Sequence, residues 1–130
     1  MDSRNCHQIT KNTHFLQSLK HALDGVKDLF LQERNFRSHV YVALLVIVMG
    51  LMLKLGISDW LWIVLAIFAV ITAEAANTIV ERIVDLIVGK RYSLVAKYAK
   101  DIAAGGVLIV SLFAAVIGIL IFIPIILRWI

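Results

Sequence analysis

A row of polar side chains interrupts one of the most apolar parts of this sequence. Glu74, Asn77, Glu81 and Asp85 follow one another at spacings of three, four and four residues. In an α-helix these positions lie on one face, within roughly 80° of one another. Carboxylates four residues apart repel each other, and a carboxylate near the hydrocarbon of a membrane is costly unless a cation or a proton offsets it. The spacing therefore predicts a helix face that holds a cation.

The residue types on this face are suited to phosphoryl transfer. Mg²⁺ is usually bound by one or two carboxylates together with the phosphates of a substrate. A lysine such as Lys100 could neutralise phosphate charge, and a further carboxylate at the membrane surface could take a proton from a lipid hydroxyl. A proton-coupled transporter would also place carboxylates within the membrane, so both functions stay open on these residues alone.

The composition indicates that the surrounding solvent is lipid. The chain has 130 residues, of which 61% are hydrophobic, and a mean hydropathy of +0.88. Soluble domains contain only about 45–50% apolar residues. The formal net charge is +4, but the basic residues flank the apolar runs, so no nucleic-acid partner is predicted. The single cysteine, Cys6, excludes an intrachain disulfide, and no phosphate-binding glycine motif is present.

Four helices in one all-α membrane domain are predicted to position the polar residues. Apolar residues recur at helical spacing over residues 15–34, which predicts an amphipathic helix on the membrane surface. Residues 1–14 are expected to form a flexible cytoplasmic tail. Apolar runs long enough to cross the hydrocarbon, with their flanks counted, predict three spans. These spans cover residues 39–57, 60–88 with a cytoplasmic extension, and 93–127.

The distribution of basic residues predicts the orientation in the plasma membrane. Most of them precede the first span or lie between the second and the third. The positive-inside rule then places the N-terminus and that loop in the cytoplasm, with the C-terminus outside. No apolar signal segment is predicted at the N-terminus. Glu33 comes just before the first span, at the membrane level of Glu74 and Glu81, and its simpler interpretation is a solvated charge or a pair with Arg37.

The start of the third span carries two further signals. Ser93 is predicted to cap its N-terminus. A run of alanine and glycine over residues 96–106 favours close helix packing, which would bring Lys100 near the carboxylate face.

Three strings of the sequence resemble one membrane enzyme family. AEAANTIVERIVDL (residues 73–86) and AKYAKDIAAGGVLI (residues 96–109) are similar to the prokaryotic diacylglycerol kinase and undecaprenol kinase family. ERNFRSH (residues 33–39) resembles the undecaprenol kinases of Gram-positive bacteria in particular. The resemblance extends over roughly residues 15–127, in the same order of helices.

This resemblance implies a homotrimer with composite sites at its subunit boundaries. It implies transfer of the ATP γ-phosphate to a membrane lipid alcohol. Undecaprenol, giving undecaprenyl phosphate, is preferred over diacylglycerol, which would give phosphatidic acid. By the same resemblance Glu74 is the general base and meets the lipid together with Arg37, Glu33 and Glu81 hold Mg²⁺, and Asp85 is a supporting residue. The residues that the resemblance assigns to the nucleotide are Glu33, Asn77, Glu81, Arg91, Tyr92, Lys100 and Asp101.

The sequence departs from the family pattern in the loop before the third span. Lys90 and Arg91 stand where the family is often acidic or neutral, and Ser93 stands where histidine is frequent. The alternative function is a non-enzymatic membrane subunit or a small proton-coupled transporter. A kinase needs Glu33, Lys100 and Asp101 at the cytoplasmic face, whereas a transporter needs only the carboxylate within the membrane.

Overall fold

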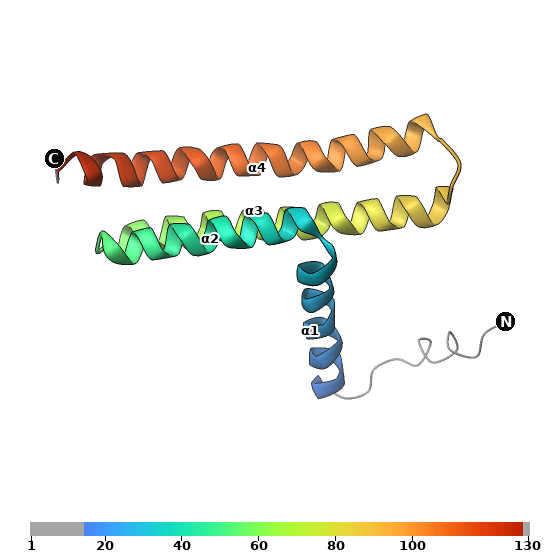
Figure 1. Cartoon of the computed structure of the whole chain (residues 1–130), viewed down its shortest axis with the longest axis horizontal. Helices are drawn as coiled ribbons and strands as arrows, with labels where there is room; N and C mark the ends of the chain where they lie inside the picture. The colour runs from blue at the N-terminus through green and yellow to red at the C-terminus, as the bar shows by residue number, and fades with distance from the viewer. Residues whose placement is uncertain (1–14, 129–130) are drawn as a thin grey trace.

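The computed structural model describes residues 15–128, and this part of the chain is helical throughout apart from short turns (Figure 1). Its helices are α1 (Phe15–Gln32), α2 (Arg34–Met52), α3 (Ile57–Val88) and α4 (Leu94–Leu127). Within the described residues, α2, α3 and α4 are long and apolar enough to cross a membrane. The predicted all-helical fold, with three helices long and apolar enough to span a membrane, is thus confirmed. The predicted tail over residues 1–14 lies outside the described residues.

The three long helices lie side by side, and α1 leaves them in a different direction. Figure 1 shows α4 running antiparallel to α3, with α2 folded back along the first part of α3. The second part of α3 extends past the start of α2 and stays paired with α4 alone. Helix α1 crosses the direction of this bundle and meets it near the middle of α3 (Figure 1). The junction of α1 and α2 therefore faces the carboxylate-bearing part of α3.

The first span begins and ends earlier than the sequence predicts. Helix α2 starts at Arg34, because a single extended residue, Glu33 (φ −101°, ψ 113°), suffices to turn the chain out of α1. At the other end Lys54 adopts a positive φ of 52°, and the amide of Leu55 bonds back to the carbonyl of Gly50. This turn stops the helix at Met52 although the apolar run continues to Ile57.

The turn between α2 and α3 is held by a compact apolar cluster. Leu55, Ile63 and Phe122 are buried together, and Trp60 packs against them. Gly50 makes room for this packing, because a Cβ atom there would lie 2.9 Å from Cη2 of Trp60. The cluster ties the end of α4 to the hairpin of α2 and α3 and so fixes which residues of the three helices face one another.

The start of α4 is capped as predicted. The side-chain oxygen of Ser93 accepts a hydrogen bond from the amide of Ala96 at 3.3 Å. Helix α3 ends just before, where Gly89 takes a positive φ of 61° that favours glycine. The five residues between α3 and α4 therefore form a tight corner, which places the polar ends of both helices next to each other.

Candidate active site

The predicted polar face of α3 runs from the interior of the bundle to its surface. Glu74, Asn77 and Thr78 are buried, with exposed fractions of 3%, 5% and 3%. Farther along the same face Glu81 is half-buried and Asp85 is exposed. Burying ionisable and amide groups without partners is unfavourable. Packing alone therefore gives no reason for polar side chains on this buried face. Its position between neighbouring helices is typical of a functional site.

Glu74 faces His39 of α2. The Nε2 atom of His39 lies 3.9 Å from Oε2 of Glu74, which is too long for a hydrogen bond. The side chain of His39 is 27% exposed, whereas that of Glu74 is only 4% exposed. Sequence analysis did not assign His39 to the site. The sequence did hold a signal for this contact. His39 lies 17 residues before the turn at Gly56 and Glu74 lies 18 residues after it, so two antiparallel helices joined there bring them to the same height.

Asn77 orients the next carboxylate of the face. Its Nδ2 atom donates a hydrogen bond to Oε1 of Glu81 at 3.1 Å. The Oδ1 atom of Asn77 is buried and has no hydrogen-bond partner among the described residues. An unused carbonyl oxygen beside a fixed carboxylate is a donor set that suits a hard cation such as Mg²⁺. Within residues 15–128 no three acidic, histidine or cysteine side chains converge as a group that could hold a metal ion.

Glu33 reaches the same level from the junction of α1 and α2. Its Oε1 atom accepts a hydrogen bond from Nη2 of Arg82 at 2.9 Å, and Arg82 directly follows Glu81 on α3. The sequence suggested an ion pair between Glu33 and Arg37, and this prediction is wrong. Arg37 instead donates from Nη1 to the carbonyl of Leu31 at 2.7 Å and to that of Phe30 at 3.1 Å. A cation over the last carbonyls of α1 satisfies their acceptors and the negative end of the helix dipole.

The end of the polar face meets α4. Lys100 donates to Oδ1 of Asp85 at 2.5 Å, so the prediction that Lys100 approaches the carboxylate face is confirmed. Asp101 points elsewhere and pairs with Lys97, one turn away, at 2.8 Å. Asp85 follows Glu74 by eleven residues, which corresponds to about 16 Å along the helix axis. One chain therefore keeps Lys100 close to Asp85 and far from Glu74.

A hollow of about 240 Å³ lies at the corner between α3 and α4. It gathers three residues that were predicted to meet a nucleotide, the predicted supporting residue and one further lysine. Among the residues that line it are Asp85, Arg91, Tyr92, Lys97 and Lys100. Three cations around one hollow favour an anionic ligand. Asp101, which was predicted for the same ligand, is not among the residues that line the hollow.

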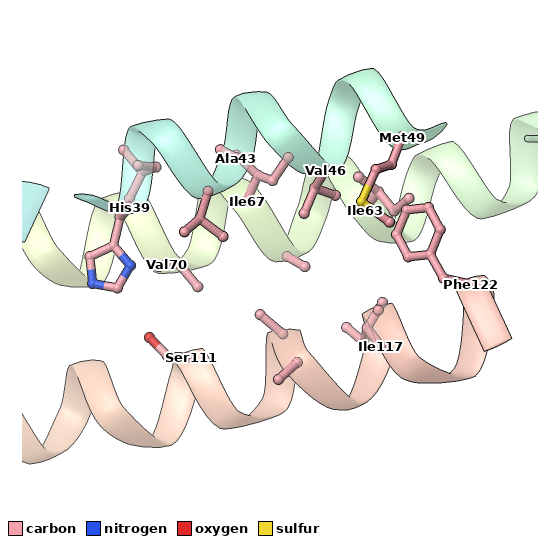
Figure 2. A pocket seen from close by; sticks show the side chains of 16 residues that line it. His39, Ala43, Val46, Met49, Ile63, Ile67, Val70, Ser111, Ile117 and Phe122 are labelled. Atoms are coloured by element: carbon pink, nitrogen blue, oxygen red, sulfur yellow. The ribbon is translucent and has the colours of Figure 1, made fainter. Parts of the chain in front are cut away.

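A second cavity, of about 260 Å³, lies between α2, α3 and α4 (Figure 2). Its lining is apolar except at one end, where His39 of α2 and Ser111 of α4 face it (Figure 2). The Oγ atom of Ser111 is buried and has no hydrogen-bond partner among the described residues. Because His39 also faces Glu74, the polar end of the cavity adjoins the buried carboxylate. Sequence analysis did not foresee this cavity.

These features define a small helical membrane protein that carries a polar, carboxylate-rich site at one end of its spans. Residues 20–122 match the family of prokaryotic diacylglycerol kinases, and the chain belongs to that family.

Relatives with assigned names cover most of the chain. The undecaprenol kinase of Bacillus subtilis is 40% identical over 124 residues, which are 95% of this chain and 98% of that protein. The diacylglycerol kinase of Synechocystis is 36% identical over 88% of this chain and 65% of that protein. The diacylglycerol kinase of Helicobacter pylori strain 26695 is 32% identical over 75% of each chain.

Proposed function

We propose that this protein is a lipid kinase that transfers the γ-phosphate of ATP to the hydroxyl of undecaprenol, giving undecaprenyl phosphate. The observation that carries the proposal is the enclosed carboxylate of Glu74 beside an apolar cavity, in a chain of this kinase family. A transporter or a non-enzymatic subunit is not supported, since the named relatives of the chain are kinases.

Undecaprenol is preferred over diacylglycerol for two reasons. The undecaprenol kinase of Bacillus subtilis matches this chain over nearly the whole length of both proteins. The cavity between the three spans is apolar along its length and polar only near its His39 end, which suits an alcohol with one hydroxyl and a long hydrocarbon chain. Diacylglycerol, whose ester groups would also need polar partners, remains the second candidate substrate.

In this proposal Glu74 is the general base. Its carboxylate accepts the proton of the lipid hydroxyl while the hydroxyl oxygen attacks the γ-phosphorus. Burial keeps water away from the carboxylate, so the substrate hydroxyl has no competitor there. Arg37, at the junction between α1 and the first span, is proposed to meet the lipid near the membrane surface. Its bonds to the end of α1 hold it there.

Glu33 and Glu81 are proposed to hold Mg²⁺ together with the nucleotide phosphates. When bound, the ion neutralises negative charge that develops on the transferred group. Asn77 orients Glu81 through its amide and offers a free carbonyl oxygen on the same side. Glu33, which pairs with Arg82, is the residue that joins α1 to α2, whereas Glu81 lies on α3. This division makes the metal site dependent on how α1 and α2 join.

The corner between α3 and α4 is proposed to bind ATP. Arg91 and Lys100 would meet its phosphates, and Tyr92 offers an aromatic face at the rim of the same hollow. Lys100 would exchange Asp85 for a phosphate oxygen, which gives Asp85 the supporting role of holding the lysine beforehand. Asp101 would act on the nucleotide from outside the hollow, paired with Lys97.

The active unit is proposed to be a homotrimer in the bacterial plasma membrane with composite sites. The separation of about 16 Å between the levels of Glu74 and Asp85 supports this, because Lys100 of the same chain is then remote from the base. The exposed apolar residues of α1, among them Phe15, Leu16 and Leu23, suit a helix that lies on the membrane surface. The N-terminus would then be cytoplasmic and the C-terminus outside.

The proposed function is tested by ATP turnover of the purified protein in detergent. Undecaprenol, diacylglycerol and no lipid are compared at the same ATP and Mg²⁺ concentrations, and the phosphorylated lipid is identified by mass. Undecaprenol should give the highest kcat/KM. Equal turnover without lipid would contradict lipid phosphorylation, and a higher kcat/KM with diacylglycerol would reverse the substrate assignment.

A further inference from the structure

We propose that Ser111 and His39 position the reacting group of the lipid: Ser111 binds the hydroxyl of an alcohol whose chain lies in the cavity, and His39 directs Glu74 toward that hydroxyl. This inference rests on the proposed lipid kinase function. It adds His39 of α2 and Ser111 of α4 to the residues that the sequence assigned to the site.

The hydroxyl of Ser111 gives the apolar cavity an unused hydrogen-bonding group, which suits a ligand with one polar group. A serine within an apolar helix usually satisfies its hydroxyl on the carbonyl one turn earlier. Here the Oγ atom is buried without any partner among the described residues. Figure 2 shows the hydroxyl directed into the cavity, opposite the helix that carries His39. A buried hydroxyl without a hydrogen bond is unfavourable, so a ligand oxygen at this position would remove that cost.

His39 connects the cavity to the base. Its ring lines the polar end of the cavity, and its Nε2 atom lies 3.9 Å from Oε2 of Glu74. No other basic side chain of the described residues comes within ion-pair distance of Glu74. The imidazole is therefore the one basic group beside this carboxylate within residues 15–128, and in the proposal this contact orients it. An alcohol entering beside the ring would find the carboxylate turned toward it.

The proposed occupant is the part of the lipid's hydrocarbon chain next to its hydroxyl, because a cavity of about 260 Å³ holds only a portion of so long a chain. The lining consists of aliphatic side chains, one phenylalanine and one methionine apart from the two polar residues at its end. A chain lying here leaves its hydroxyl between Ser111 and the level of Glu74. In the reaction the O–H bond breaks and its proton passes to Glu74, the new O–P bond forms, and ADP leaves with the electrons of the broken O–P bond.

The binding test labels a thiol placed in the cavity. In a Cys6→Ser background, Ser111→Cys introduces a single cysteine with little change in volume, and its alkylation by N-ethylmaleimide is timed with and without undecaprenol. Undecaprenol should slow the labelling of Ser111→Cys several-fold, and ATP should not. The matched control is Leu112→Cys in the same background, because Leu112 is 59% exposed and does not line the cavity. The labelling rate of Leu112→Cys should not change when undecaprenol is added.

The kinetic test separates binding from positioning. Ser111→Ala should raise the KM for undecaprenol by roughly 3–10-fold, the range for one lost hydrogen bond, with the KM for ATP unchanged. His39→Leu should instead lower kcat by about tenfold at saturating lipid, as for an imperfectly oriented base. His39→Gln keeps a polar N–H group on the side of Glu74 and should have a higher kcat than His39→Leu.

Several results would overturn the proposal. One is equal labelling of Ser111→Cys with and without undecaprenol, and another is protection that follows protein concentration, which would assign the cavity to a second copy of the chain. Unchanged lipid KM in Ser111→Ala together with unchanged kcat in His39→Leu would do the same. Failure of the kinase function is recognised separately, since the wild-type protein would then phosphorylate no lipid whatever the labelling shows.

Discussion

Replacing Glu74 with glutamine is the sharpest perturbation of the proposed mechanism. The amide has nearly the same shape as the carboxylate but cannot accept the proton of the lipid hydroxyl. General-base catalysis contributes about 10²–10⁴-fold, so Glu74→Gln should retain only about 0.01–1% of the wild-type kcat. The fold should persist, because the nearest basic atom, Nε2 of His39, is 3.9 Å away and no hydrogen bond of Glu74 is lost.

The stability of this variant separates a catalytic role from a structural one. Glu74 is only 3% exposed, and a neutral amide is cheaper to bury than a carboxylate. We therefore expect the thermal unfolding midpoint of Glu74→Gln in detergent to stay level or rise. The assay is the formation of lipid phosphate at saturating ATP and undecaprenol, accompanied by nucleotide binding and unfolding measurements. Asp59→Asn, in the first turn of α3 and away from Glu74, is the control and should behave as wild type.

Two results would refute the reasoning about Glu74. Near-wild-type turnover of Glu74→Gln would remove the residue from the chemistry altogether. A lower unfolding midpoint with a proportionate loss of nucleotide binding would show that the carboxylate supports the structure instead of accepting a proton.

Three further predictions follow from the site and the packing. Glu33→Ala and Glu81→Ala should each raise the Mg²⁺ concentration for half-maximal activity, because each removes one of few protein oxygens; unchanged dependence in both would contradict the metal assignment. Gly50→Ala should lower the unfolding midpoint, since overpacking typically costs about 1–3 kcal/mol and exceeds the gain of about 1 kcal/mol in helix propensity. Mixing inactive Glu74→Gln with inactive Lys100→Ala should restore partial activity if separate chains share a site, and a fully active monomer would contradict it.

Two control variants keep these results interpretable. Arg82→Ala breaks the ion pair of Glu33 without removing a metal ligand, so it should change the Mg²⁺ dependence less than Glu33→Ala. Gly25→Ala places a methyl group where nothing lies within 4 Å, so its unfolding midpoint should not fall. A fall as large as that of Gly50→Ala would show that the contact with Trp60 is not the cause.

Much of the fold could be predicted because its signals are local. Apolar runs identified the three spanning helices, and Ser93 was recognised as an N-cap from its place before an apolar run. The helical spacing of Glu74 and Asn77 placed them on one face, and both are buried there beside Thr78. These inferences need only the period of one helix and the hydropathy of a short window.

The contacts between helices were harder to foresee. The sequence suggested Arg37 as the partner of Glu33, whereas the partner is Arg82, which lies 49 residues away in the chain. Arg37 is taken up by the end of α1, a contact that depends on the chain turning at one residue. His39 and the unpartnered Ser111 were not assigned to the site from the sequence. The neighbours of a single polar residue in an apolar helix can be predicted only once the register between the helices is known.

The unequal lengths of the long helices bear on where each substrate is dissolved. Helix α2 has 19 residues, or about 28 Å, close to the thickness of the hydrocarbon layer. Helix α3 continues for fourteen residues beyond Glu74, about 21 Å, and its last part extends past the start of α2 beside α4. A bilayer matched to α2 leaves that extension and its basic corner in water. A nucleotide bound there as proposed would keep its hydration while the lipid stays in hydrocarbon, and the boundary between the two solvents would then fall at the carboxylates.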